Sequence, residues 1–362
     1  MSGIEPWRRT LYAVAIAQFI ALGGGNLVFP FMPFYVEDLG VTGERQIALW
    51  SGLLGTATGS MLFLFSPIWG GLADRFGRKP LLLRAYVGAM ITLTLQGAVQ
   101  SVWQLLILRG LQGVFVGTIP AATALVATSA PRERVAYSLG LLQMGLFTSQ
   151  LVGPLAGGLL ASSIGIRPTF FGAGGFYVLS FLLVWLFVNE EFERPTAEER
   201  QSIIGNLRLV TDVRPLLVII CFVFFLNAGP PFVRPIIPIL VDSYDTAVRP
   251  ETLSGIAFAA MALTSAFAAF SASRVSGLFG YRNALALATL GAGVAYLPVA
   301  VATNVPSLIV LIAVVGLFSG AMIPTANALI DQWAPPGRQA SAFGLAGSSM
   351  ALAFAIAPLT GG

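Results

Sequence analysis

Long apolar runs follow one another along almost the whole chain, and they constrain the fold more than any other feature. Eleven runs reach the length of about 17 to 25 residues that crosses a bilayer as a helix. The first is too long for a cleaved signal peptide. We therefore predict an all-α polytopic membrane protein, with spans at 11–36, 47–70, 81–100, 104–126, 138–162, 169–188, 215–240, 252–273, 285–303, 306–327 and 340–362.

Composition narrows the class of protein further. Only 10% of the residues are charged, whereas a soluble domain carries about 25%. The chain has no histidine and a single cysteine, Cys221, which excludes zinc sites built from His and Cys and also catalytic triads. No pair of acids lies inside a span. We therefore expect no enzyme, no metal and no cofactor, and 16 acids against 20 bases leave no patch for nucleic acid.

Basic residues lie mostly on one side of the predicted spans. With the N-terminus in the cytoplasm, fifteen of the twenty lysines and arginines, Arg84 among them, fall on the cytoplasmic side. Three fall outside, and Arg109 and Arg234 lie within spans. Because cytoplasmic loops carry an excess of Lys and Arg, we expect a multi-pass membrane protein with a cytoplasmic N-terminus.

An internal repeat divides the chain into two halves. Segment 124–158 matches segment 328–362 at a constant offset of 204, with twelve identities in 35 positions that include Pro154 and Pro358. Internal repeats with a site between them are typical of secondary transporters. We expect a six-helix half at 1–188, a cytoplasmic linker at 189–214 and a second half at 215–362. The second half lacks a twelfth span, so we also expect a fragment of a longer protein.

The loop between the second and third spans carries a dense motif. It reads Gly-Gly-Leu-Ala-Asp-Arg-Phe-Gly-Arg-Lys-Pro over 70–80, and it resembles the signature loop of the major facilitator superfamily. The resemblance implies a conformational latch in which Asp74 approaches the start of the eleventh span, where helix-end N–H groups favour an anion. In the second half Gly277 stands opposite Asp74, so the latch is one-sided. The simpler alternative is a basic, glycine-rich loop. The latch residues are Gly70, Asp74, Arg75, Gly77, Arg78 and Lys79.

Two further motifs resemble those of the same superfamily. Gly153, Pro154, Gly157 and Gly158 in the fifth span resemble the antiporter motif, which implies exchange rather than one-way transport. Close helix packing by small residues is a compatible alternative. In the fourth span, 108–117 resembles the motif whose arginine, here Arg109, is linked to proton transfer. A charge inside the membrane normally faces a cavity or a partner, although a long side chain can also snorkel to the surface.

The first half resembles the bacterial drug:proton antiporter branch of this superfamily most closely. Segments 26–40, 103–109 and 166–171 carry that likeness, and the second half agrees more weakly. The resemblance implies a transporter that exports lipophilic or amphiphilic drugs by alternating access, with the proton gradient as energy source. No acid lies inside a span, so Glu37 and Asp38, at the outer end of the first span, are the proton-coupling candidates nearest to Arg109.

The resemblance places the substrate cavity between the halves, near mid-membrane. Each amide in the candidate lining can instead bond a neighbouring helix. We expect a monomer that binds small lipophilic molecules within the lipid bilayer. A lipid or glycolipid flippase of the same fold is the alternative, because it would share every motif. The candidate lining residues are Gln18, Asn26, Gln112, Gln143, Gln150, Asn227, Arg234 and Asn327.

Overall fold

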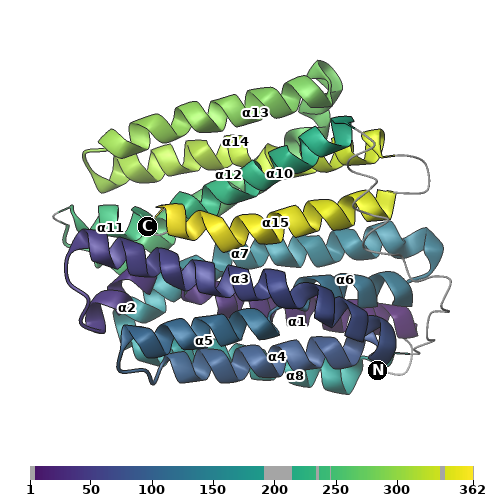
Figure 1. Ribbon diagram of the computed structural model, residues 1–362, viewed down its shortest axis with the longest axis horizontal. Coiled ribbons are helices and arrows are strands. Elements are labelled where there is room, and N and C mark those ends of the chain that lie inside the picture. Colours follow the sequence, from purple (N-terminus) through teal and green to yellow (C-terminus); the bar gives the residue numbers. More distant parts are fainter. Residues whose placement is uncertain (1–4, 191–213, 234–235, 245, 335–338, 362) are drawn as a thin grey trace.

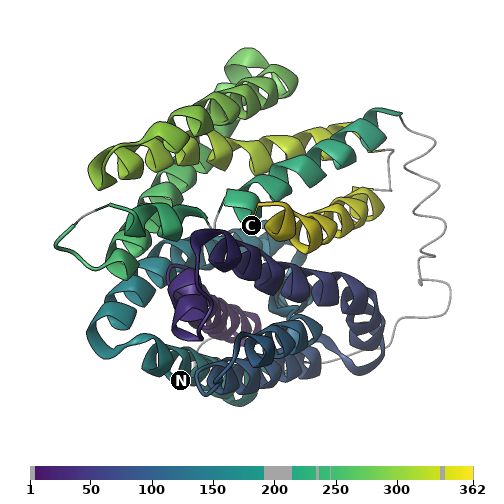
Figure 2. The same ribbon diagram turned by 60° about the vertical axis from the view of Figure 1, so that its left-hand side comes forward.

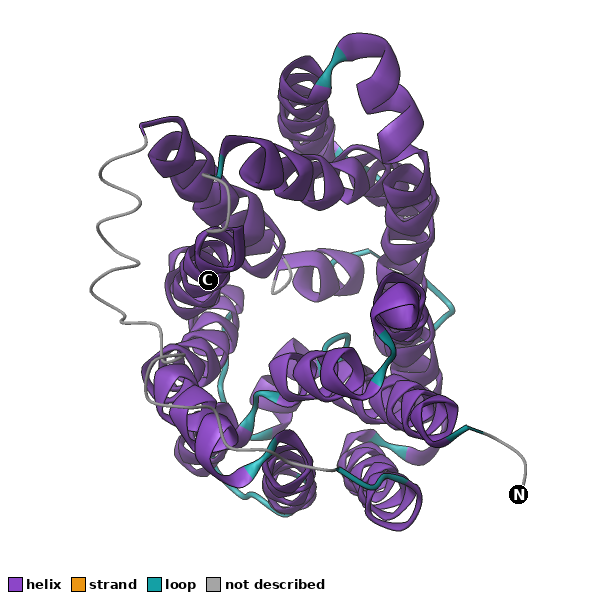
Figure 3. Cartoon of the chain, turned by 90° about the vertical axis from the view of Figure 1, so that its right-hand side faces the viewer, coloured by secondary structure: helices purple, strands orange, loops and turns teal. Residues whose placement is uncertain are grey.

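The computed structural model describes residues 5–190, 214–233, 236–244, 246–334 and 339–361. These residues form helices joined by short loops, and no strand occurs among them. Figure 3 looks along the bundle and shows most helices end-on. Seven helical stretches among the described residues are long and apolar enough to cross a membrane, and shorter apolar helices cover 217–229 and 345–357. The prediction of an all-helical, polytopic membrane protein is therefore confirmed.

The first half of the bundle is built around one apolar core (Figure 1). Its largest fully buried side chains include Tyr35, Tyr86, Phe31 and Phe170, and the ring centroids of Tyr35 and Phe170 lie 5.0 Å apart. The helices are α1 (Pro6–Leu27), α2 (Met32–Asp38), α3 (Glu44–Phe76), α4 (Arg78–Gln96), α5 (Val102–Phe115), α6 (Thr118–Ser129), α7 (Val135–Ile164) and α8 (Ile166–Phe187), with a 3-10 turn at Arg132–Arg134.

The second half has two smaller apolar clusters of its own. Val135 and Gln339, which begin α7 and α15, are related by the same offset of 204 as the sequence repeat. The repeat thus marks equivalent helices in the two halves. The helices are α10 (Arg214–Val233), α11 (Ile236–Asp242), α12 (Pro250–Phe279), α13 (Tyr281–Tyr296), α14 (Val305–Trp333) and α15 (Gln339–Gly361), with a 3-10 turn at Leu297–Val301.

Two predicted spans each consist of two helices, which corrects the expectation of continuous helices at 11–36 and 104–126. The first breaks between α1 and α2, where Pro30 has no N–H for a helix hydrogen bond. The fourth breaks between α5 and α6 at Val116 and Gly117. In the seventh span, residues 234 and 235, between α10 and α11, lie outside the described residues.

The two halves meet along α3 with α15 and along α7 with α12 (Figures 1 and 2). The contacts of α2 with α11 join them further. We call the end of the bundle that holds the turn between α3 and α4 the loop end, and the end that holds α2 and α11 the far end. The N-terminus lies at the loop end, on the right of Figure 1.

Candidate functional site

The signature loop is a turn of one residue between two long helices. α3 ends at Phe76, α4 begins at Arg78, and Gly77 between them has a φ of +97°. Other residues rarely adopt this conformation, which explains the glycine. The side chain of Asp74 and residues 335–338 before α15 lie outside the described residues. The predicted contact between Asp74 and the start of the eleventh span therefore stays a prediction.

A carboxylate just after α8 holds this loop in place. The two oxygens of Glu190 accept hydrogen bonds from the backbone N–H groups of Arg78 and Lys79, at 2.8 and 2.7 Å. In return, the Lys79 ammonium donates to the backbone carbonyls of Trp185 and Val188 at the end of α8. The start of α4 and the end of α8 are thus tied together by two reciprocal contacts. Sequence reasoning missed Glu190, because these partners lie more than a hundred residues apart.

Arg109 is buried in a cluster of neutral groups. Its side chain is 7% exposed, and its guanidinium donates to the Gln112 carbonyl oxygen and the Met32 sulfur, each at 3.4 Å. The Gln96 amide also donates to Gln112, at 3.1 Å. Arg109 Nε has no hydrogen-bond partner among the described residues. Arg109 therefore lies inside the protein rather than snorkelling to the surface.

The two candidate acids stand on α2, the helix that Met32 begins. Glu37 and Asp38 lie at the surface of the far end, and neither forms an ion pair with Arg109 among the described side chains. Partial burial raises the pKa of the Asp38 carboxyl above its usual range, and the Arg167 guanidinium opposes that rise. The contact between Arg109 and Met32 nevertheless brings the arginine against the helix that carries both candidate acids.

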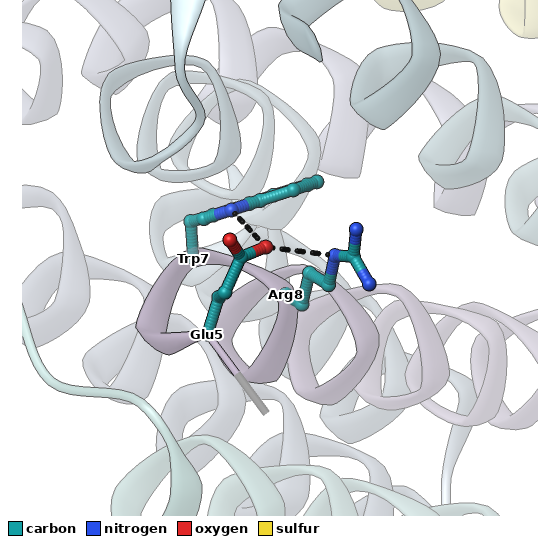
Figure 4. A network of polar contacts seen from close by, with 3 residues as sticks. All are labelled: Glu5, Trp7 and Arg8. Carbon is teal, nitrogen blue, oxygen red and sulfur yellow. Dashed lines mark hydrogen bonds and ion pairs between the residues drawn. The ribbon is translucent and has the colours of Figure 1, made fainter. Parts of the chain in front are cut away.

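An ion pair among the described residues lies at the surface, at the start of α1. Figure 4 shows Glu5 with an oxygen 3.0 Å from Arg8 Nε and accepting a hydrogen bond from the Trp7 indole N–H, also at 3.0 Å. Exposed pairs of this kind contribute about 0–1 kcal/mol. No group of three or more His, Cys, Asp and Glu side chains in the described part of the chain could hold a metal ion.

The glycines of the fifth span lie against two different helices. A methyl group on Gly153 or Gly157 would collide with α1, at the side chain of Asn26 or the backbone of Leu27. Gly158 instead faces the second half, where a methyl group would collide with the backbone carbonyl of Glu251 on α12. The motif therefore packs α7 within its own half and also against the other half.

The same contact between α7 and α12 continues toward the far end. The Thr252 hydroxyl donates to the Ser162 hydroxyl at 2.8 Å, and this hydrogen bond joins the two halves. Glu251, in the first turn of α12, has one carboxylate oxygen buried with no hydrogen-bond partner among the described residues. Sequence reasoning missed Glu251 because it precedes the predicted span, which begins at residue 252.

A pocket of about 190 Å³ lies in the second half, between α10, α14 and α15. Two of the predicted lining residues, Asn227 and Asn327, belong to its walls. The Asn227 amide also donates to the backbone carbonyl of Val223 at 2.9 Å. The remaining walls are mostly apolar, and they consist of Val223, Leu226, Ile323, Ala326, Ala346, Gly347 and Met350.

The other predicted lining residues lie elsewhere. Gln18 is fully buried, where it donates to the backbone carbonyl of Thr118 at 2.8 Å and accepts from Tyr86 at 3.2 Å. Asn26 is half-buried and donates to the backbone of α7. Gln143 and Gln150 are exposed on α7, and Gln112 belongs to the Arg109 cluster. Arg234 lies outside the described residues.

The sequence pattern of the Major Facilitator Superfamily matches residues 14–248 and 232–362. The chain belongs to this superfamily. It is 34% identical over 330 residues to Multidrug resistance protein MdtG of Enterobacter lignolyticus, covering 90% of this chain and 78% of that protein. It is 35% identical over 327 residues to the protein of the same name from Salmonella arizonae, covering 90% of this chain and 80% of that protein.

Solved structures share the fold. A bacterial homolog of the human lysosomal transporter Spinster, in its inward-facing and unoccupied conformation, has a TM-score of 0.79 at 18% identity, covering 99% of this chain and 82% of that one. The nucleoside transporter NupG has a TM-score of 0.77 at 12% identity, covering 97% and 89%. The human organic anion transporter MFSD10 has a TM-score of 0.72 at 20% identity, covering 98% and 93%. These likenesses confirm the major facilitator fold.

Proposed function

We propose that this protein is a secondary transporter that exports lipophilic or amphiphilic drugs across the bacterial inner membrane, in exchange for protons and without a cofactor. One observation carries this proposal: relatives named multidrug resistance proteins are 34–35% identical over 90% of the chain. The N-terminus and the loop end face the cytoplasm, because most lysines and arginines gather there. The protein works as a monomer, with halves at 1–188 and 215–362 and a linker at 189–214.

Transport proceeds by alternating access between the two halves. Contacts between the halves at the far end support a state that is closed toward the outside: Gly158 packs on α12, and Thr252 bonds to Ser162. In the opposite state these contacts separate, and Asp74 engages the start of α15 as a latch at the loop end. Close packing at Gly158 would also limit leakage, as expected of an exchanger.

The pocket between α10, α14 and α15 is the proposed binding site. Its walls contain two amides and no charged side chain among the described residues, so it suits molecules that are mostly apolar and carry a few polar groups. Amides fix orientation through hydrogen bonds, whereas apolar walls supply most of the binding free energy. Of the predicted lining residues, Asn227 and Asn327 are therefore the ones that we propose to contact substrate.

Proton coupling involves Arg109 together with the acids on α2. A buried guanidinium without a carboxylate partner is costly, so a state in which Glu37 or Asp38 approaches Arg109 would be favoured. Release of that pair on protonation would link proton movement to the position of α2. Neutral replacement of both acids should abolish proton-driven export.

Drug export from bacterial cells tests the proposal. Cells that produce the protein should accumulate less of a fluorescent lipophilic drug than cells with an empty vector. Asn327→Ala should weaken export, whereas Gln332→Ala, an exposed amide on the same helix, should not. Equal drug accumulation in producing and control cells, together with lipid translocation by the purified protein, would favour a flippase and overturn the proposal.

A further inference from the structure

The break in the fourth span is a local feature that the fold does not require. α5 ends at Phe115, Val116 is extended, and Gly117 has a φ of +143° before α6 begins. Ala321 occupies the equivalent position in the second half, at the offset of 204, and α14 runs through it as one helix. Some other part of the first half must therefore stabilise the broken form.

The break separates the backbone carbonyls of Val114 and Phe115 from their helix donors. In a continuous helix, the carbonyls of Val114 and Phe115 would accept from backbone N–H groups four residues later. Instead, the Trp69 indole N–H donates to Val114 O at 2.7 Å, and Arg84 Nη2 donates to Phe115 O at 3.1 Å. An unpaired carbonyl inside a membrane protein costs several kcal/mol, so these two side chains make the break tolerable.

Trp69 and Arg84 also hold each other. The Arg84 guanidinium carbon lies 3.4 Å from the centroid of the Trp69 ring, a distance at which a cation is attracted to the face of an indole. Trp69 comes from the last turns of α3 and Arg84 from the second turn of α4, so the pair spans the helices on both sides of the signature loop. We call this pair, with the two carbonyls that it binds, the clasp.

Two nitrogen atoms of the Arg84 guanidinium take no part in the hydrogen bonds of the clasp. Arg84 Nε and Nη1 are buried and have no hydrogen-bond partner among the described residues. Buried donors without partners are rare and call for an explanation. A side chain that is only partly satisfied in one state is suited to exchange partners in another, which is the behaviour of a conformational switch rather than of a permanent support.

We propose that Arg84 is a positioning residue of the transport cycle: with Trp69 it holds the fourth span broken while the far end is closed, and the span becomes continuous when the far end opens. This inference rests on the proposed alternating access. The signature loop is thereby coupled, through Trp69, to α5, which carries Arg109. A displacement of the loop would therefore shift the position of the Arg109 cluster.

Amide hydrogen exchange on the whole chain in lipid nanodiscs tests the clasp directly. Arg84→Gln shortens the side chain and removes the guanidinium that reaches Phe115 O, and Trp69→Phe removes the indole donor. Gly117→Ala favours a continuous helix by straining the positive φ. In all three variants the amides of Thr118 and Ile119 should exchange at least about fivefold more slowly, the low end of usual coupling between sites, because they gain backbone acceptors. Arg84→Lys, which keeps a positively charged donor on a long side chain, should fall between wild type and Arg84→Gln.

The matched control is Arg282→Gln, which removes an exposed arginine from the first turn of α13, the second-half counterpart of α4. It should leave Thr118 and Ile119 unchanged. Unchanged or faster exchange of these amides in Arg84→Gln and Gly117→Ala would overturn the proposal, since a merely structural support would loosen the segment. The measurement needs neither drug nor gradient, so a failure of drug export would count against the proposed function alone.

Discussion

Replacing Glu190 with glutamine removes the charge that ties the linker to the signature loop. At the start of α4, whose N-cap is Gly77, the amides of Arg78 and Lys79 have no acceptor within the helix, and Pro80 has no N–H. Glu190 accepts from both amides, at 2.8 and 2.7 Å. Loss of a cap costs about 0.5–2 kcal/mol, and loss of a negative charge at a helix start costs about 0.3–1 kcal/mol. Glutamine keeps one acceptor oxygen, so the expected cost is about 1–2 kcal/mol, or about a 5- to 30-fold change in local opening.

Amide exchange measures this change at the first turn of α4. In Glu190→Gln, the peptide that covers 76–86 should exchange about 5- to 30-fold faster, while peptides from α12 and α14 keep their wild-type rates. Glu133→Gln, an exposed glutamate in the turn before α7, is the control and should change nothing in α4. Unchanged exchange at 76–86 would refute the cap, and an equal rise in every helix would show global loosening instead.

Further tests concern the far end. Cysteines at Ser162 and Thr252, whose hydroxyl oxygens lie 2.8 Å apart, should form a disulfide that stops transport until it is reduced. A cysteine pair at Ser163 and Thr252 is the control and should form no such disulfide. Full transport by the crosslinked protein would contradict a gate at this contact. Gly158→Ala, whose methyl group would collide with α12, should lower the yield of that disulfide at least about fivefold, because overpacking costs about 1–3 kcal/mol. Partial burial raises the pKa of the Asp38 carboxyl, so its ionised form destabilises the fold as pH rises through that pKa. Asp38→Asn should therefore unfold at a higher temperature than wild type at pH 7.5, and the two melting temperatures should converge as pH falls toward about 4; a constant difference across that range would argue against the shift.

Most of the fold can be predicted from sequence because a bilayer leaves the backbone few choices. Lipid-exposed segments must satisfy their hydrogen bonds internally, so long apolar runs become helices. The sequence repeat then identifies α15 as the second-half equivalent of α7. The breaks are harder to predict. Pro30 is a visible signal in the first span, but Gly117 is one glycine among 40, and its conformation depends on donors from other helices.

The candidate site was predictable only where one segment carries the whole signal. The glycines of the fifth span do pack closely, as small residues in a motif indicate. By contrast, Glu190 acts on the start of α4, and Arg84 acts on Phe115. Contacts between distant segments leave no local sequence pattern. Gln18 is the opposite case: a polar residue in an apolar span predicted a cavity-lining role, but its side chain is hydrogen-bonded to neighbouring helices.

Proton-coupled drug transport by the purified protein in proteoliposomes tests the central claim most directly. With an acidic interior, we predict that a fluorescent lipophilic drug accumulates inside while its addition makes the interior less acidic. A protonophore added beforehand dissipates the proton gradient and should abolish the accumulation. Drug entry that only equilibrates across the membrane, with no effect on internal pH, would contradict exchange of drug for protons.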